Sequence, residues 1–149
     1  MSSQDPTESI DVYSKGRTSA HDLDQPMKLE TWEIAPGRIR DESEGKIDNF
    51  AFSTAYLSQN QSVRICRDIS FHVVIIKPGT CYSWETRVAY VRLCSVASGK
   101  LQVKMHGQEF SIGSNGMVMI RPGADCTVIN KLYMDAVVHV TIVPSDLYK

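Results

Sequence analysis

The chain has 149 residues, 42% of them hydrophobic, and a formal net charge of −1. That length predicts one domain, or one domain with a tail. The near-zero charge argues against binding to nucleic acid or membrane through bulk electrostatic attraction. The charge is uneven, because residues 1–49 hold 6 basic and 11 acidic residues whereas residues 50–149 hold 10 and 6.

The polar N-terminal sequence argues against a secretory signal. No apolar run follows Met1, and no segment reaches the length of a membrane span. The four cysteines (Cys66, Cys81, Cys94 and Cys126) form no C-x-x-C pair, which argues against a zinc knuckle or a thioredoxin-like motif. We therefore expect a cytoplasmic or nuclear protein with reduced thiols.

The first 49 residues divide into two parts. Residues 1–28 are rich in Ser, Asp, Gln, Thr and Pro, so they cannot bury enough apolar surface to offset the entropy of ordering, and we predict a disordered tail. Residues 29–49 begin with LETWEIAPGRIR, in which Trp32 lies near a Pro-Gly turn. We interpret them as a docking segment and loop that lie across the domain or across a partner subunit.

Residues 50–149 are predicted to be a β-domain. Phe50–Leu57, Ile69–Ile76 and Val88–Ala97 are rich in aromatic or β-branched residues, and the second is so continuously apolar that it suits a strand buried on both faces. Leu101–His106 alternates apolar and polar residues, as a half-buried strand does. Further short strands follow at EFSI, MVMI, CTVIN and MDAVVHVTIV, separated by Gly, Pro and Asn turns. Regularly spaced short strands predict a sandwich or barrel.

Two blocks in this domain keep a distinctive spacing. The first, GTCYSWETRVAYVRLCSVASG, runs from Gly79 to Gly99, and the second, GMVMIRPGADCTVIN, from Gly116 to Asn130. The first resembles the cupin block Gly, five residues, His-x-His, three or four residues, Glu, six residues, Gly, and the second resembles the cupin Gly…Pro-x-Gly…His…Asn block. The resemblance implies an all-β, single cupin-type double-stranded β-helix, or jelly-roll, barrel over residues 50–149.

The metal-ligand positions of those blocks hold other residues. Glu85 and Arg87 stand in place of the two histidines, Arg92 in place of the glutamate and Cys126 in place of the last histidine. Because guanidinium groups only donate hydrogen bonds and stay positively charged, we expect no metal and no other cofactor.

A more specific resemblance covers residues 32–143. The segments WEIAPG, VVIIKPG, VASGKLQV and EFSIGSNGMVMI are similar to segments of the C-terminal cupin of fungal centromere protein C. That resemblance implies a metal-free barrel that homodimerises and holds an inner-kinetochore protein in pairs.

If the cupin register holds, Glu85, Arg87, Arg92 and Cys126 converge inside the barrel. One interpretation is a closed polar network in which Glu85 pairs with one of the arginines. The other is a pocket for a small anion such as a carboxylate or enolate, bound by Arg87 and Arg92 with help from Tyr82 and His72.

An enzyme would use the same groups. Glu85 would be a general base, Arg87 or Arg92 would stabilise an oxyanion, and Tyr82 or Cys126 would supply a proton. His72 and His139 otherwise read as hydrogen-bonded core residues, and His106, beside a hairpin turn, as an exposed one.

Two tryptophans suggest an interface. Trp84 precedes Glu85, so it is expected to point away from the lumen, and together with Trp32 it favours an isologous homodimer. The first functional hypothesis is accordingly a homodimerisation module that recruits protein partners. The alternative is a metal-independent isomerase, cyclase or decarboxylase of a fungal biosynthetic pathway that binds a small anionic molecule in the barrel.

Overall fold

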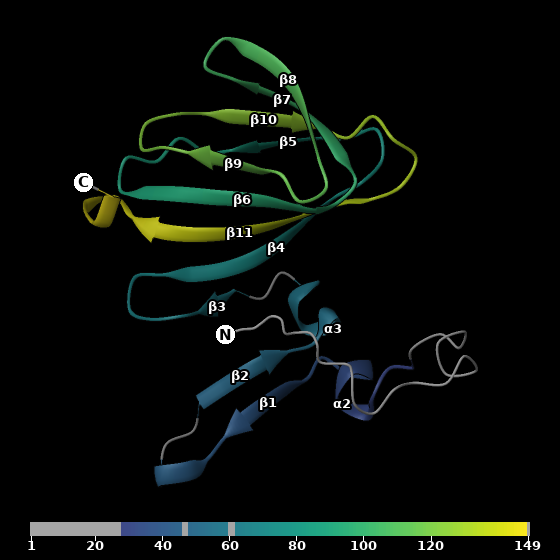
Figure 1. The fold of residues 1–149 in the computed structure, drawn as a ribbon, viewed down its shortest axis with the longest axis vertical. Coiled ribbons are helices and arrows are strands. Elements are labelled where there is room, and N and C mark those ends of the chain that lie inside the picture. Colours follow the sequence, from purple (N-terminus) through teal and green to yellow (C-terminus); the bar gives the residue numbers. More distant parts are fainter. Residues whose placement is uncertain (1–27, 46–47, 60–61, 149) are drawn as a thin grey trace, which may run out of the picture. The chain divides into compact units, whose positions relative to one another are not determined.

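The computed structural model describes residues 28–45, 48–59 and 62–148. Within these ranges the chain is built mainly of antiparallel β-strands, which form a five-stranded sheet, a four-stranded sheet and a separate two-stranded hairpin (Figure 1). The predicted all-β jelly-roll fold is confirmed. The predicted tail, residues 1–28, lies outside the described residues except for its last one.

The five-stranded sheet has the order β3-β4-β11-β6-β9, so its central strand is the last strand of the chain. Its strands are β3 (Val63–Arg64), β4 (Ser70–Ile76), β6 (Tyr90–Ser98), β9 (Met117–Ile120) and β11 (Ala136–Pro144). The 3-10 turn η2 (Ser145–Tyr148) follows β11.

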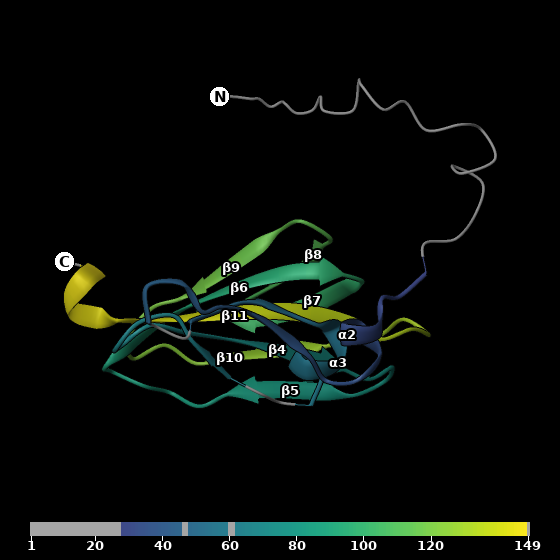
Figure 2. The ribbon, with the colours of Figure 1, turned by 90° about the horizontal axis from the view of Figure 1, so that it is seen from below.

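The four-stranded sheet has the order β5-β10-β7-β8. Its strands are β5 (Cys81–Trp84), β7 (Lys100–Met105), β8 (Gln108–Gly113) and β10 (Cys126–Ile129). In Figure 2, β9 and β6 lie on one side of the molecule and β5 on the other.

Alternating side chains of both sheets meet in one core. Val74, Val96 and Val138 contribute from the five-stranded sheet, and Val103 and Val128 from the four-stranded one. Because successive side chains of a strand point to opposite faces, the register fixes which residues share the core face. The predicted alternation of Leu101–His106 is confirmed by the burial of Leu101 and Val103.

Most predicted strands are confirmed within two residues at each end. Phe50–Leu57 is different, because it divides into β2 (Asp48–Phe52) and the one-turn helix α3 (Thr54–Leu57). Ser53 causes the break: its backbone is extended, and its Oγ accepts hydrogen bonds from the backbone N–H groups of Tyr56 and Gly37, each at 3.0 Å. A serine that caps a helix in this way ends the strand before it.

The predicted docking segment forms a small substructure. It comprises α2 (Thr31–Ile34), β1 (Arg38–Asp41), the 3-10 turn η1 (Ser43–Gly45) and the β2 strand, which pairs with β1. Trp32 is half-buried in α2, which contacts α3 and β1. Its predicted role at a subunit interface stays a prediction.

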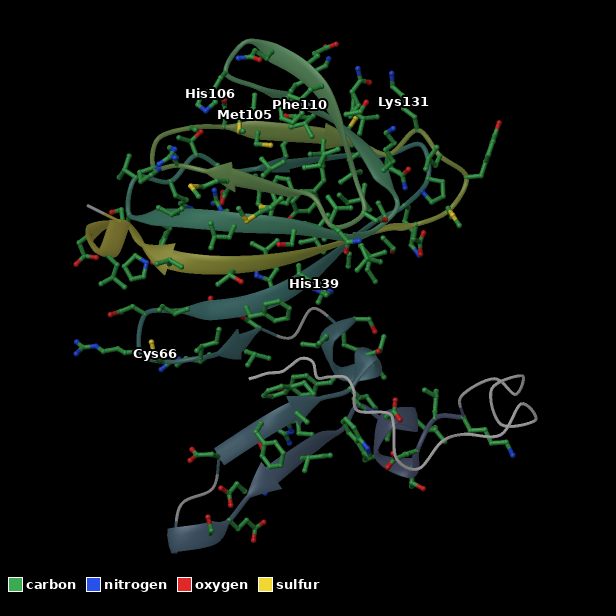
Figure 3. All side chains as sticks on the ribbon, viewed as in Figure 1. Cys66, Met105, His106, Phe110, Lys131 and His139 are labelled. Atoms are coloured by element: carbon green, nitrogen blue, oxygen red, sulfur yellow. The ribbon has the colours of Figure 1, made fainter. Side chains whose placement is uncertain are left out.

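The hairpin turns follow the predicted Gly positions. Between β7 and β8, His106 and Gly107 both have positive φ, 56° and 71°, which matches the twist of the flanking strands. Figure 3 shows His106 at this turn, and its side chain is exposed as predicted. Gly99 approaches Ala136 so closely that a Cβ there would lie 3.0 Å from the Ala136 Cα.

Candidate functional site

A row of four inward-facing residues lies at one end of the five-stranded sheet's core face. Ser70, Ile142, Arg92 and Ile120 occupy neighbouring positions on β4, β11, β6 and β9. One step deeper the corresponding residues are His72, Val140, Cys94 and Val118. The core face therefore changes from apolar to polar towards this end, and Arg92 stands at the boundary.

Arg92 is buried without a counter-charge. It is only 8% exposed, yet its side chain forms no ion pair or hydrogen bond with another residue that the structure describes. None of its nitrogens is both sealed from solvent and unpaired, since Trp84 Nε1 is the sole such atom within the described ranges. The guanidinium therefore opens onto the pocket described below. Its predicted inward orientation is confirmed.

Trp84, in contrast, points inward. It is 7% exposed and belongs to the core, where its ring stands edge-on to Tyr82 with centroids 4.8 Å apart. The expectation that Trp84 faces a partner subunit is wrong. Burying the indole removes far more apolar surface from water than burying its neighbour Glu85 would, so the strand turns the tryptophan inward.

The inward Trp84 places Glu85 outside. The Glu85 carboxylate accepts a hydrogen bond from Arg87 Nη2 at 2.9 Å, and the two side chains are 74% and 53% exposed. The predicted convergence of Glu85 and Arg87 with Arg92 and Cys126 inside the barrel is therefore wrong. Strand β5 ends at Trp84, so the spacing of the cupin block does not fix where the next residues point.

Cys126 does lie inside, beside a second thiol. Burial raises the pKa of Cys126 to about 11, with the Asp125 charge adding to the effect. Burial also raises the pKa of Cys94 to about 12; nearby Cys126 adds to this effect and Arg92 opposes it. Both groups are neutral thiols at physiological pH, which is the wrong state for a nucleophile.

His72 lies on the core face opposite Val140, as the register requires. Burial lowers its pKa, and the positive charge of Arg92 lowers it further, so the imidazole is neutral at pH 7. His139 lies on the opposite, outer face, where its ring stands edge-on to Phe71 with centroids 5.4 Å apart; Figure 3 labels it on β11. The interpretation of His139 as a core residue is therefore wrong.

Arg92 opens onto a pocket of about 590 Å³, here called the arginine pocket. Four arginines line it: Arg64 on β3, Arg67 in the β3–β4 turn, Arg87 in the β5–β6 loop and Arg92 on β6. The other lining residues are Ser62, Asp68, Ile69, Ser70, Tyr90 and Ile142. Tyr82 and His72, expected at a ligand site, do not line it.

The sequence analysis missed Arg64 and Arg67. One local signal existed: SVRICRDIS holds two arginines, Arg64 just before a tight turn and Arg67 within it, ahead of a buried strand. The β3–β4 register sets Arg64 opposite Ser70, and the β4–β11–β6 pairing then brings it towards Arg92. The proximity of Arg64 to Arg92 depends on pairings between strands that are far apart in the sequence.

The core does not suit the metal that many cupins hold. Trp84 fills the space between the sheets, and only about 10 Å³ is left among the core side chains around it. Arg92 adds a fixed positive charge close to Cys94. A cation there would meet an arginine and two protonated thiols, which is an unsuitable donor set. Within the described ranges, no three His, Cys, Asp or Glu side chains are grouped to hold a metal ion.

The outer faces of the two sheets differ sharply. On the four-stranded sheet Ser83 and Thr127 share a hydrogen bond of 2.9 Å, and Lys104 pairs with Glu109 at 3.3 Å. On the five-stranded sheet the outward positions form what we call the outer apolar face: Val63, Phe71, Val73, Ile75, Val91, Leu93, Ser95, Met117, Met119, Val137, His139, Thr141 and Val143. That face has no Asp, Glu, Lys or Arg.

The outer apolar face also has a depression. It has a volume of about 220 Å³ and is lined only by Val91, Leu93, Met119 and Val143. Met117 at the edge of the face is 50% exposed and Ile75 is 37% exposed, whereas Val73 and Val91 are only 7% and 3% exposed and the other members are half-buried. Antiparallel sheets normally turn a polar face to water, so an apolar outer face needs a physical reason.

No helix in the part of the chain that the structure describes combines the length and the hydrophobicity that a membrane crossing requires.

Comparison with solved structures shows a cupin fold. A double-stranded β-helix domain protein from Klebsiella pneumoniae aligns with a TM-score of 0.52 at 15% identity, over 57% of this chain and 75% of that one. The Cupin_2 domain of an XRE-family transcriptional regulator from Enterobacter cloacae aligns with a TM-score of 0.51 at 16% identity, over 56% of this chain and 92% of that one.

Among the similar structures is the cupin domain of Cnp3 from Schizosaccharomyces pombe. It aligns with a TM-score of 0.62 at 14% identity, over 76% of this chain and 90% of that domain. The predicted likeness to the centromere-protein cupin is confirmed at the level of the fold. No protein-family model matches the sequence, and no curated protein matches it.

Proposed function

We propose that this chain is a non-catalytic cupin module that forms a homodimer through the outer apolar face and thereby recruits protein partners in pairs. The observation that carries the proposal is the contrast between the two outer faces. The four-stranded sheet turns ion pairs and hydroxyl groups to solvent, whereas the five-stranded sheet turns valine, leucine, methionine and phenylalanine outward.

A second copy of the chain is the occupant that this face suits. A two-fold axis brings a residue on the axis next to its own copy and a residue off the axis next to another residue of the same face, so a single charge on this face would meet a like charge or an apolar group. Because the face lacks formal charges, it is self-complementary without a matched pattern. The position of Leu93 on the central part of β6 and the depression beside it give the apolar contacts that an interface core uses.

The size of the face is compatible with a small dimer interface. Five strands about 4.8 Å apart make a sheet roughly 20 Å wide, and the nine-residue strands β6 and β11 are roughly 30 Å long, whereas β3 and β9 have only two and four residues. The area is therefore at most roughly 600 Å², below the roughly 800 Å² that each partner buries in an interface of standard size. A lysine at the centre of this face would therefore be buried against its symmetry mate.

Light scattering on the purified protein tests the proposal. We expect a mass of about twice the 16.7 kDa of one chain at a protein concentration of about 10 μM. Leu93→Lys is expected to weaken self-association at least roughly 100-fold, because two charges would be desolvated in an apolar interface. The mass of this variant should fall to that of one chain.

Ile129→Lys is the matched control. Ile129 points outward from β10 on the polar sheet, so the same change of side chain there should leave the dimer intact. A monomeric wild-type protein, or equal effects of the two substitutions, would refute the proposal.

The enzyme alternative has less support. Its proposed base, Glu85, lies on the surface in an ion pair with Arg87, and its proposed proton donor, Cys126, is sealed in the core. Trp84 fills the space between the sheets, and the arginine pocket, which could hold a small molecule, is lined by neither Glu85 nor Cys126. The geometry therefore favours the dimerisation module over a metal-independent isomerase, cyclase or decarboxylase.

A further inference from the structure

We propose that the arginine pocket is a binding site for a small organic anion with two negative charges, of the phosphate monoester class. This inference goes beyond the dimerisation role and does not rest on it. The pocket is reached by the inward-facing side chain of Arg92 near the start of β6, whereas the dimer would use the outward-facing side chains of the same strand. The proposal stands on charge, burial and shape.

The charge of the pocket is unbalanced. Four arginines line it, and the carboxylates available to them are Asp68 in the lining and Glu85, which pairs with Arg87. The site therefore has two more positive than negative charges. Arg64 and Arg67 form no ion pair with any residue that the structure describes. A ligand with two negative charges would neutralise the excess.

Arg92 gives the site its depth. Arg92 is more than nine-tenths buried, its side chain has no partner among the described residues, and its nitrogens are open to the pocket that it lines. A charge-assisted hydrogen bond is stronger in such a largely enclosed place than in bulk water. An anion that enters the pocket would replace solvent as the acceptor of this guanidinium.

The remaining walls set the kind of anion. Ile69, Ile142 and the ring of Tyr90 add an apolar and aromatic side to the pocket, and its volume of about 590 Å³ lies within the range of small-molecule sites. An inorganic ion would leave these walls unused. Guanidinium forks bind phosphate oxygens in pairs, and a phosphate monoester approaches a charge of −2 at neutral pH. A phosphate on a compact ring fits both halves of the site.

Isothermal titration calorimetry at pH 7.5 with phenyl phosphate tests the site. We expect saturable binding with a Kd below about 1 mM, weakened as NaCl is raised because the contacts are ionic. Phenyl sulfate, which has the same ring and one charge, should bind at least roughly fivefold more weakly. Benzyl alcohol, which has no charge, should not bind, and inorganic phosphate should bind more weakly than phenyl phosphate.

Two variants locate the binding. Arg92→Gln should raise the Kd for phenyl phosphate at least roughly tenfold, since it removes a charge-assisted pair of hydrogen bonds. Arg64→Gln, at an exposed position where folding is not at risk, should raise it several-fold. Arg40→Gln is the matched control, because Arg40 is an exposed arginine of β1 outside the pocket. Circular dichroism would check that each variant is folded.

The proposal would be overturned if the folded wild-type protein bound none of the probes. It would also fail if benzyl alcohol or phenyl sulfate bound as tightly as phenyl phosphate, or if Arg64→Gln and Arg92→Gln matched Arg40→Gln. These results are independent of the dimer proposal, because subunit mass is measured separately on the Leu93→Lys variant.

Discussion

Arg92 and Leu93 are neighbours in the chain and serve opposite surfaces. Strand β6 directs Arg92 towards the core and the arginine pocket, and Leu93 towards the outer apolar face. Successive side chains of a strand point to opposite faces of the sheet. Two adjacent residues of β6 therefore belong to a charged site on one face and to an apolar surface on the other. Substitutions at the two positions are expected to act independently.

The thiols give a prediction at the scale of single residues. Cys66 and Cys81 are exposed, whereas Cys94 and Cys126 are buried with pKa values raised to about 12 and about 11. A pH between 7 and 9 is below both pKa values, so the two buried thiols stay protonated. They are also inaccessible to the reagent. With a thiol reagent at pH 8 we expect two fast equivalents per chain, and all four only after denaturation.

The control for this experiment is the double variant Cys66→Ser, Cys81→Ser, which should show no fast equivalent at pH 8. A third fast equivalent in the wild-type protein would show that Cys94 or Cys126 reaches solvent, and it would contradict the filled core.

The β10–β11 connection gives a prediction at the scale of an element. Asn130 is fully buried, and its Nδ2 donates to the backbone oxygens of Ile76, at 2.9 Å, and Met134, at 2.8 Å. Its Oδ1 accepts from the backbone N–H of Leu132 at 3.0 Å. One side chain thus joins the end of β4 to the loop that precedes β11.

We expect Asn130→Ala to lower the free energy of unfolding by about 2–4 kcal/mol, because it leaves buried backbone groups without partners. Urea denaturation followed by circular dichroism measures the change. Asn49→Ala, at an exposed position of β2, should stay within about 0.5 kcal/mol of the wild-type protein. Equal effects of the two substitutions would show that the Asn130 contacts do not hold the connection.

Element boundaries were partly predictable. Gly and Pro turns and alternating runs located β4, β7 and β9 well, because these signals are local. The segment that begins at Phe50 was predicted as one strand, and propensity alone gives no reason to split it. Its division at Ser53 depends on a hydrogen bond to Gly37, 16 residues earlier in the chain, which a local pattern does not contain.

On the scale of the whole molecule, the two outer faces make the sandwich asymmetric. If the apolar face is covered by a second copy, folding and association are linked, and the thermal midpoint depends on protein concentration. Raising the concentration 100-fold is expected to raise the Tm by roughly 5 °C. Differential scanning fluorimetry or calorimetry at several concentrations measures it.

Leu93→Lys should remove this concentration dependence and leave a lower, constant Tm, whereas Ile129→Lys should keep it. A wild-type Tm that does not change between 2 and 200 μM (roughly the range accessible to both methods) would argue against a dimer that stabilises the fold.

The sequence by itself determined the class of fold, because strand periodicity, turn glycines and the spacing of two blocks are properties of the chain in order. It also placed Arg92 and Cys126 at inward positions correctly. Only the tertiary structure decided that Trp84 and not Glu85 faces the core. Side chains alternate between the two faces of a strand, but that alternation allows either set to face the core, and the choice depends on which side chain gains more from burial. It likewise brought Arg64 and Arg67 to Arg92 and gathered the outer apolar face, because both arise from pairings between strands that are distant in the sequence.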